Sequence, residues 1–423
     1  MGFQKGHDTD RGARNIVILV TLDTKSEEAF YLHRLIMERG HNPVIMDIGI
    51  SGEAPSGPRG FAREDVARSA GCRSMEEMRA RSRDYNDSLS MMAMGAKKLL
   101  GDLIAEGRLD GLISIGGSLG NAQALRIMRE LPFRIPKIAV STVAFIGELI
   151  TIEMVSVDQA MMQTVADLQG INHITKMILE RAAGAICGMV EMQRTADEEH
   201  KPLVAISALG VHDYVPHCKS LLMEKGFELV VFHSVGTGAL EKMIRQNYFE
   251  GVLDLCCYEL VSLVCGGPVR GGKEKFVAAC EAEIPQVISV GAMDFFPWPV
   301  GWLVPAKFKK RPMISHADAN LVKTTPPEQR KIAAVLAERM NHAKAPAVVL
   351  VPMKGFSRLD RGEGAPFYDE GAGGRFIRAL KKGLSNPLVE VREVDAHIND
   401  PLFAEAASET IAEKLAHMAS ARS

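Results

Sequence analysis

Two glycine-rich turns are the segments of this chain whose residue types most directly suggest chemistry. Each follows an apolar run and precedes a stretch with helical spacing, and backbone N–H groups at such a helix N-terminus can bind an anion such as phosphate. Neither turn has the ending of a P-loop or the spacing of a dinucleotide fingerprint, so a turn needed only for tight strand-to-helix geometry is the alternative. The turns contain Gly116, Gly117, Ser118 and Gly120 in the first half, and Gly236, Thr237 and Gly238 in the second.

Residues suited to proton transfer and charge neutralisation lie in the second half of the chain. His233, Lys354 and the pair Asp395 and His397 each follow an apolar run. An imidazole near a carboxylate can act as general acid or base, and a lysine can neutralise a phosphate or carboxylate. Hydrogen-bonded structural histidines and an ordinary surface lysine are the alternatives. These four residues are the predicted catalytic group.

The remaining candidates are polar or glycine residues that come just after other apolar runs. In open α/β sheets, ligands bind beyond the carboxyl ends of the strands, so these positions are predicted to contact a cofactor or ligand. No G-x-S-x-G elbow or H-E-x-x-H zinc helix occurs, and no metal site of the protein's own is predicted. The candidates are Asp23, Thr24, Lys25, Asp47, Ser141, Thr142, Gly291 and Asp294.

The elements that must position these residues occur twice. The first copy consists of an apolar run at 16–21, an amphipathic stretch ending at Gly40 and a second apolar run ending at Asp47. The second copy repeats this order, with a run at 203–207, a stretch ending at Gly226 and a run ending at His233. A glycine after a charged last turn suits a left-handed helix C-cap. Two further pairs of segments match: 109–113 with 249–253, and 135–140 with 284–289.

Short apolar strands that alternate with helices indicate parallel strands covered on both faces. The sequence therefore predicts an α/β fold of two Rossmann-like domains with mainly parallel sheets, related by internal duplication. The predicted domains are 1–195, with an insertion near 51–94, and 196–423, with a C-terminal extension. The charged stretch 191–201 is the predicted connection, and any ligand site is expected in the cleft between the domains.

The composition of the 423 residues excludes several classes of protein. Hydrophobic residues make up 47% and the net charge is −2, which is typical of a globular protein and argues against nucleic acid as a partner. No apolar run reaches the roughly 18 residues needed to span a bilayer, so no membrane partner is expected. The seven cysteines lack C-x-x-C spacing, and a cytoplasmic location is predicted. The basic cluster 307–311 is interpreted as a solvated loop.

An ordered series of motifs also resembles a known family. They are Thr21–Lys25, Gly116–Ser118, Ile135–Lys137 with Ser141 and Thr142, Gly170–Asn172, Phe232–His233 with Gly236–Gly238, Val287–Asp294, Thr324–Pro326 and Glu393–Asp400. Across nearly the whole chain they are similar to the Tm-1-like ATP-binding domain family. The resemblance implies a two-domain Rossmann-like architecture, a homodimer and ATP binding, with Mg²⁺.

The chain departs from this family at two places. Leu119 and Asn121 replace a glycine and a threonine of the family's glycine-rich turn, and Phe145 and Ile146 stand where the family has small residues. A bulkier, more apolar pocket is expected from these changes.

Three functions therefore stay open. The first is a nucleotide-binding protein. The second is an enzyme, a hydrolase or lyase, that acts on a small carboxylated or phosphorylated compound. The third is a ligand sensor without catalytic activity.

Overall fold

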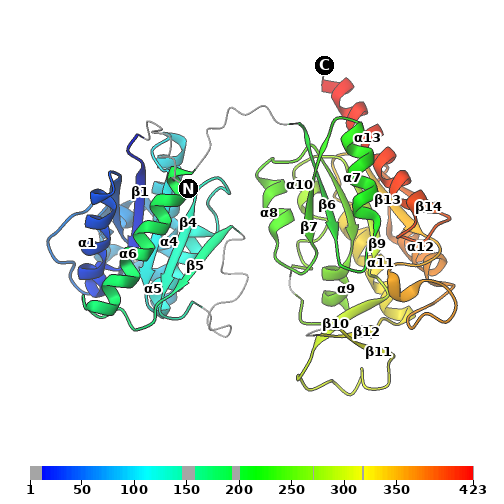
Figure 1. Ribbon diagram of the computed structural model, residues 1–423, viewed down its shortest axis with the longest axis horizontal. Coiled ribbons are helices and arrows are strands. Elements are labelled where there is room, and N and C mark those ends of the chain that lie inside the picture. Colours follow the sequence, from blue (N-terminus) through cyan, green and yellow to red (C-terminus); the bar gives the residue numbers. More distant parts are fainter. Residues whose placement is uncertain (1–11, 145–157, 193–200, 270, 317–318, 423) are drawn as a thin grey trace, which may run out of the picture. The chain divides into compact units, whose positions relative to one another are not determined.

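The chain folds into two compact units, Met1–Asp197 and Glu198–Ser423, which are described separately (Figure 1). The structure is a computed structural model, and it describes all residues except 1–11, 145–157, 193–200, 270, 317–318 and 423. Most of the predicted connection 191–201, together with Phe145 and Ile146, lies outside the described residues.

The first unit is built on a parallel sheet of five strands in the order β2-β1-β3-β4-β5. Its strands are β1 (Asn15–Val20), β2 (Asn42–Asp47), β3 (Gly111–Gly116), β4 (Lys137–Ser141) and β5 (Gln159–Gln163). Its helices are α1 (Leu22–Glu38), α2 (Arg63–Ser69), α3 (Met75–Arg81), α4 (Tyr85–Ala105), α5 (Ser118–Met128) and α6 (His173–Glu191).

Helices cover both faces of this sheet, as the continuous apolar strands require. Alternate residues of β1 point to opposite faces, because the side-chain period of a strand is two. Ile16 and Ile18 pack in a core with α1 and α6, whereas Val17 and Leu19 pack in a second core with α4 and α5. The predicted insertion supplies α2, α3 and the start of α4, which add to the second core.

The second unit contains a parallel sheet of six strands in the order β14-β13-β9-β8-β6-β7 and an antiparallel sheet in the order β10-β12-β11. The parallel strands are β6 (Leu203–Ala208), β7 (Glu228–His233), β8 (Gly251–Cys256), β9 (Gln286–Gly291), β13 (Ala347–Pro352) and β14 (Val389–Val394). The antiparallel strands are β10 (Phe295–Pro299), β11 (Met313–His316) and β12 (Ala319–Lys323). The helices are α7 (Tyr214–Glu224), α8 (Ala239–Arg245), α9 (Tyr258–Cys265), α10 (Ala278–Glu281), α11 (Pro326–Met340), η1 (Arg358–Asp360), α12 (Ala372–Gly383) and α13 (Pro401–Arg422).

The two parallel sheets share one topology over four strands. The order β2-β1-β3-β4 in the first unit corresponds to β7-β6-β8-β9 in the second. The strand register also corresponds, because Ile16 pairs with Gly111 and Val204 pairs with Gly251. The predicted fold class, two duplicated Rossmann-like domains, is confirmed.

The antiparallel sheet was not predicted from the sequence. Its strand β10 contains Pro297 and Pro299, and proline is confined to edge strands because it cannot donate a ladder hydrogen bond. β10 is an edge strand that pairs with β12 alone. In Figure 1 this sheet lies at one end of the unit, with residues 300–312 beyond it. None of the described helices is long and apolar enough to cross a membrane.

Candidate functional site

The predicted catalytic residues do not form one group. His233 ends β7, whereas Lys354 follows β13, and Asp395 and His397 follow β14. β7 and β14 are the opposite edges of the six-stranded sheet. At roughly 4.8 Å per strand, these edges are about 24 Å apart, so one small substrate cannot contact both.

His397 is held inside the second unit by two hydrogen bonds. Its Nδ1 accepts from the Asn399 N–H at 3.1 Å, and its Nε2 therefore donates to the Ser357 carbonyl oxygen at 3.0 Å. Burial lowers the pKa of His397, which favours the neutral ring. Lys354 and Asp395 form an exposed ion pair at 3.0 Å. In this state, Nε2 of His397 joins the loop after β14 to the loop after β13, and Nδ1 fixes the ring within its own loop.

Gly291, the last residue of β9, and Asp294, which follows this strand, are also internal. A Cβ atom at Gly291 would lie 2.6 Å from the Leu255 carbonyl oxygen and 2.9 Å from Cε1 of His212, so only glycine fits there. The Ser357 hydroxyl donates to Asp294 Oδ2 at 2.7 Å. Burial raises the pKa of Asp294 to about 6. Both residues hold loops of the second unit together.

The second glycine turn contacts a carboxylate side chain of the protein. The Gly236 N–H donates to Glu259 Oε1 at 3.3 Å, and Glu259 lies in the first turn of α9. The other oxygen of Glu259 is 3.4 Å from the ammonium of Lys275, which is 2.7 Å from Asp254. All three of these charged side chains are buried. A carboxylate therefore fills the position where a phosphate was expected.

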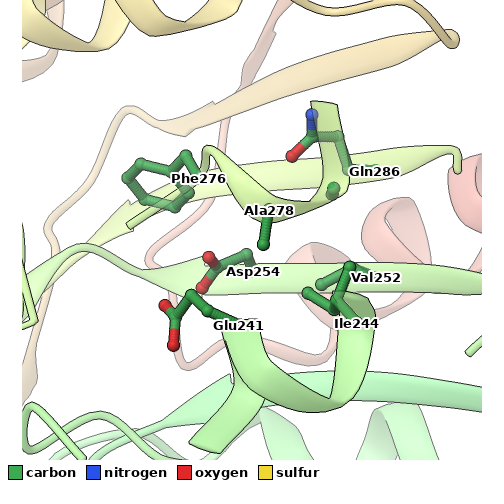
Figure 2. Close-up of a pocket in the computed structure, with 8 residues that line it drawn as sticks. Glu241, Ile244, Val252, Asp254, Phe276, Ala278 and Gln286 are labelled. Carbon is green, nitrogen blue, oxygen red and sulfur yellow. The ribbon is translucent and has the colours of Figure 1, made fainter. Parts of the chain in front are cut away.

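A small cavity lies beside this buried cluster (Figure 2). Glu241, Asp254 and Gln286 are its polar lining residues. Its volume of about 10 Å³ has room for roughly one water molecule. Burial raises the pKa of Glu241 to about 7, because Lys275 offsets only part of the cost of ionising a carboxyl there.

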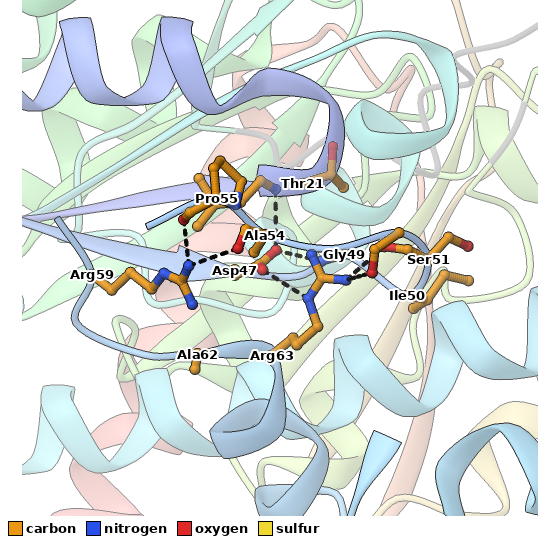
Figure 3. A network of polar contacts seen from close by, with 12 residues as sticks. Thr21, Asp47, Gly49, Ile50, Ser51, Ala54, Pro55, Arg59, Ala62 and Arg63 are labelled. Carbon is orange, nitrogen blue, oxygen red and sulfur yellow. Dashed lines mark hydrogen bonds and ion pairs between the residues drawn. The ribbon is translucent and has the colours of Figure 1, made fainter. Parts of the chain in front are cut away.

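In the first unit, Asp47 organises the loops that follow β1 and β2 (Figure 3). Its Oδ1 accepts from the N–H groups of Leu22 at 3.2 Å and Gly49 at 2.9 Å, and its Oδ2 accepts from Arg63 Nε at 2.9 Å. Asp47 is fully buried. It therefore caps α1 and fixes the loop after β2, using both of its oxygens.

Arg63, from the predicted insertion, holds the same loop from the other side. Its Nη1 donates to the carbonyl oxygens of Ser51 at 2.6 Å and Gly52 at 3.0 Å. Asp23 lies nearby in the first turn of α1. Burial raises its pKa and Arg63 opposes this rise, while the charge of Asp47 adds to it.

Thr24 and Lys25 follow Asp23 in α1. The Thr24 hydroxyl is 3.0 Å from that of Thr21, and Thr24 itself is exposed. Lys25 is partly exposed and has a non-helical backbone conformation.

The first glycine turn leads into the N-terminus of α5, a helix of 11 residues. A Cβ atom at Gly116 would lie 3.0 Å from the backbone nitrogen of Asn121, so a larger residue would crowd the tight turn. The N-cap is Gly117, which offers no side chain, and the first turn contains no acidic residue. The first N–H groups of a helix have no partner within it. Those of Ser118 and Gly120 are therefore the groups available to an anion.

Two threonine hydroxyls lie close to this helix end. Thr21 Oγ1 is 3.5 Å from the position of a Cβ at Gly120, and Thr142 Oγ1 is 3.9 Å from that at Gly117. β1 and β3 are neighbours from which the chain runs to opposite sides of the sheet, and such a switch point is where open α/β sheets bind ligands. The neighbouring Ser141 is buried, and its hydroxyl accepts from the Val143 N–H at 3.1 Å.

Leu119 and Asn121, the two residues that differ from the family's glycine turn, lie in different environments. Leu119 is 55% exposed, so its side chain does not fill the core beneath the turn. Asn121 is buried, and neither polar atom of its amide has a hydrogen-bond partner among the described residues. No group of three or more His, Cys, Asp or Glu side chains in the described parts of the chain is arranged to hold a metal ion.

Sequence reasoning missed Arg63, Glu259 and Lys275. Arg63 lies in the insertion, and no repeat or motif marks it. Glu259 and Lys275 come from separate segments that meet only in the fold. The duplication offers one signal for Glu259, because this residue stands in the first turn of the helix that corresponds to α5.

Comparison with protein families matches each unit to a family model. The model of the Uncharacterised protein family (UPF0261) N-terminal domain matches residues 14–195, and the model of its C-terminal domain matches residues 201–415. A UPF0261 protein of Brucella suis is 34% identical over 92% of this chain and 93% of its own length. One of Clostridium tetani is 34% identical over 96% of this chain and 99% of its own.

A plant protein is also similar. The ToMV resistance protein Tm-1(GCR237) of Solanum lycopersicum is 34% identical over 75% of this chain, which corresponds to 43% of the plant protein. Among solved structures, the rhamnosyltransferase SpnG with thymidine diphosphate matches 96% of this chain with 12% identity and a TM-score of 0.20. The UDP-GlcNAc 2-epimerase of Methanocaldococcus jannaschii matches 87% with 9% identity and a TM-score of 0.23. Scores this low carry no argument about function.

Proposed function

Starting from the fact that the chain belongs to the UPF0261 family, we propose that its first unit binds the phosphate groups of a nucleotide such as ATP at the N-terminus of α5. One observation carries this proposal. α5 begins at the switch point between β1 and β3 with a glycine N-cap and no acidic residue in its first turn. Its positive end is therefore not neutralised by the helix itself.

The neighbouring groups fit the phosphate chain of such a ligand. Backbone N–H groups of Ser118 and Gly120 donate to phosphate oxygens, and the hydroxyls of Thr21 and Thr142 flank the same helix end. A bound nucleotide brings Mg²⁺, which supplies positive charge next to the phosphates. Asp47 and Arg63 act indirectly, because they fix the loop and the helix start beside Thr21.

Isothermal titration calorimetry with ATP and Mg²⁺ tests the proposal. The whole protein is expected to bind ATP, and Ser118→Asp is expected to abolish the binding because the new carboxylate occupies the helix end. Thr237→Asp makes a comparable change at the second glycine turn and serves as the matched control. It is expected to bind ATP like the unchanged protein.

Two results would overturn the proposal. One is the absence of a heat signal at millimolar ATP with a folded protein. The other is loss of binding in Thr237→Asp with normal binding in Ser118→Asp, which would move the site to the second unit.

A further inference from the structure

Residues 300–312 form the loop between β10 and β11, which lies at one end of the second unit (Figure 1). Val300 is 51% exposed, Trp302 59% and Leu303 86%. Three large apolar side chains are therefore exposed within four residues, and exposed apolar patches mark interaction surfaces. We call residues 300–312 the tip loop.

The tip loop is positively charged, although the whole chain has a net charge of −2. It contains Lys307, Lys309, Lys310 and Arg311, and the sequence has no acidic residue from Phe295 to Met313. Arg311 is bound by Glu328 at 2.8 Å, and Lys307 lies over the ring of Phe308. Lys309 and Lys310 are exposed, and neither forms an ion pair with a described residue. Their charges are therefore available to an anionic partner.

Aromatic packing ties the tip loop to the rest of the second unit. The ring of Trp298 lies 5.4 Å from that of Phe308 and 6.2 Å from that of Trp302, and Phe296 lies 5.0 Å from Phe308. Phe296 and Phe308 are fully buried, so this cluster ties the loop to the core of the unit. A surface that is already ordered loses little conformational entropy when it binds.

From this combination we infer that the tip loop docks on an anionic phospholipid surface. Val300, Trp302 and Leu303 enter the boundary between headgroups and acyl chains, and Lys309 and Lys310 contact lipid phosphates. Apolar side chains rimmed by lysines are the chemistry of reversible membrane attachment. This contact is peripheral, so it does not require a membrane-spanning helix, and none of the helices in the described parts of the chain is one.

The charge and apolar side chains of the tip loop together favour lipid over a second copy of the chain or a nucleic acid. Two copies of the loop packed about a twofold axis would bring unpaired lysines together, and like charges repel. A nucleic acid would use the lysines but leave Leu303 and Val300 in water. Lipid satisfies both kinds of side chain.

Sedimentation with lipid vesicles tests this inference in the full chain. The probes are vesicles of phosphatidylcholine mixed equally with phosphatidylglycerol, and vesicles of phosphatidylcholine alone. We expect binding to the anionic vesicles and at least about tenfold weaker binding to the others, since each lysine near an anionic surface changes affinity about fivefold. Both tryptophans of the chain, Trp298 and Trp302, lie in or beside the tip loop, so a shift of the emission to shorter wavelength reports its insertion.

Matched variants make the test specific. Lys309→Glu with Lys310→Glu is expected to weaken binding at least about tenfold, whereas Lys381→Glu with Lys382→Glu, the same change at exposed residues of α12, is expected to leave it unchanged. Leu303→Asn should weaken binding, with Leu402→Asn as the exposed control.

Three results would overturn the inference. The first is equal binding to both kinds of vesicle, and the second is equal weakening by the two lysine pairs. The third is the absence of vesicle binding together with loss of self-association in Leu303→Asn, measured by sedimentation velocity, which would assign the surface to a second copy of the chain.

Discussion

The switch points of the two duplicated sheets have the same backbone topology but different contents. In the first unit, β3 ends at Gly116, Gly117 follows it, and α5 begins with the exposed Ser118. In the second unit, β8 ends at Cys256, Cys257 follows it, and α9 begins with Tyr258; all three residues are buried. The duplication preserved the elements while the space at their ends was left open in one copy and filled in the other.

The N-termini of α5 and α9 also differ in charge. Glu259 in the first turn of α9 provides a negative charge at the positive helix end, and Lys275 balances it. The first turn of α5 has no acidic residue. An internal anion therefore stabilises the second unit at the place where the first unit would receive a ligand's phosphate.

The largest expected effect concerns the buried cluster of the second unit. Lys275→Met removes the cation that lies between Asp254 and Glu259, and it leaves these buried carboxylates without a cationic partner. Breaking such a buried pair costs about 3–5 kcal/mol of unfolding free energy. Urea unfolding of the variant measures this loss.

The exposed neighbour provides the control. Lys273→Met removes a lysine two residues away, and its effect should stay within about 0.5 kcal/mol. Equal stabilities of the two variants would show that the internal ion pair does not hold the second switch point together.

A smaller effect is expected at the glycine turn of the first unit. Gly116→Ala places a Cβ atom 3.0 Å from the backbone nitrogen of Asn121, so the start of α5 must shift. Overpacking of this kind costs about 1–3 kcal/mol. At Gly120 the nearest atom is Thr21 Oγ1 at 3.5 Å, an ordinary contact, so Gly120→Ala should retain the stability of the unchanged protein. Thermal unfolding measures both, and a larger loss in Gly120→Ala would contradict the geometry.

The smallest effect is a pH dependence in the second unit. The folded pKa of Glu241, about 7, lies above its ordinary value of 4.5. The folded state therefore binds the proton more tightly, and this contribution to stability is lost as the pH rises through 7. Between pH 5.5 and 6.5 the loss is about 1 kcal/mol. Glu241→Gln should remove it.

The matched change at an exposed position of the same unit is Glu224→Gln, which should keep the pH dependence of the unchanged protein. Urea unfolding at several pH values separates these variants. A Glu241→Gln protein whose unfolding free energy still falls by the same amount would mean that another group titrates there.

The fold could be predicted because its signals are local and repeated. Glycines such as Gly40 and Gly226 end helices with φ of 88° and 89°, which favours glycine, and they mark the same point in both copies. The antiparallel sheet escaped prediction because Pro297 and Pro299 argued against a strand, and only the edge position of β10 permits them.

The candidate site could be predicted only where its residues are neighbours in the sequence. Gly116, Gly117 and Ser118 come directly after a strand, so their place at the end of the sheet was expected. The distinction between the two glycine turns depends on Glu259 meeting Gly236 from another segment. Contacts of that kind are set by packing in three dimensions, and no local pattern in the sequence reveals them.

Amide chemical shifts in the full chain provide the most direct test of the difference between the two glycine turns. Inorganic tripolyphosphate is added while the backbone N–H signals of both glycine turns are followed by NMR. Saturable shifts at Gly117, Ser118 and Gly120, with Thr237 and Gly238 unchanged, are the predicted result. Shifts only at the second turn, or no shifts at either turn, would contradict the proposal that the first turn binds phosphate.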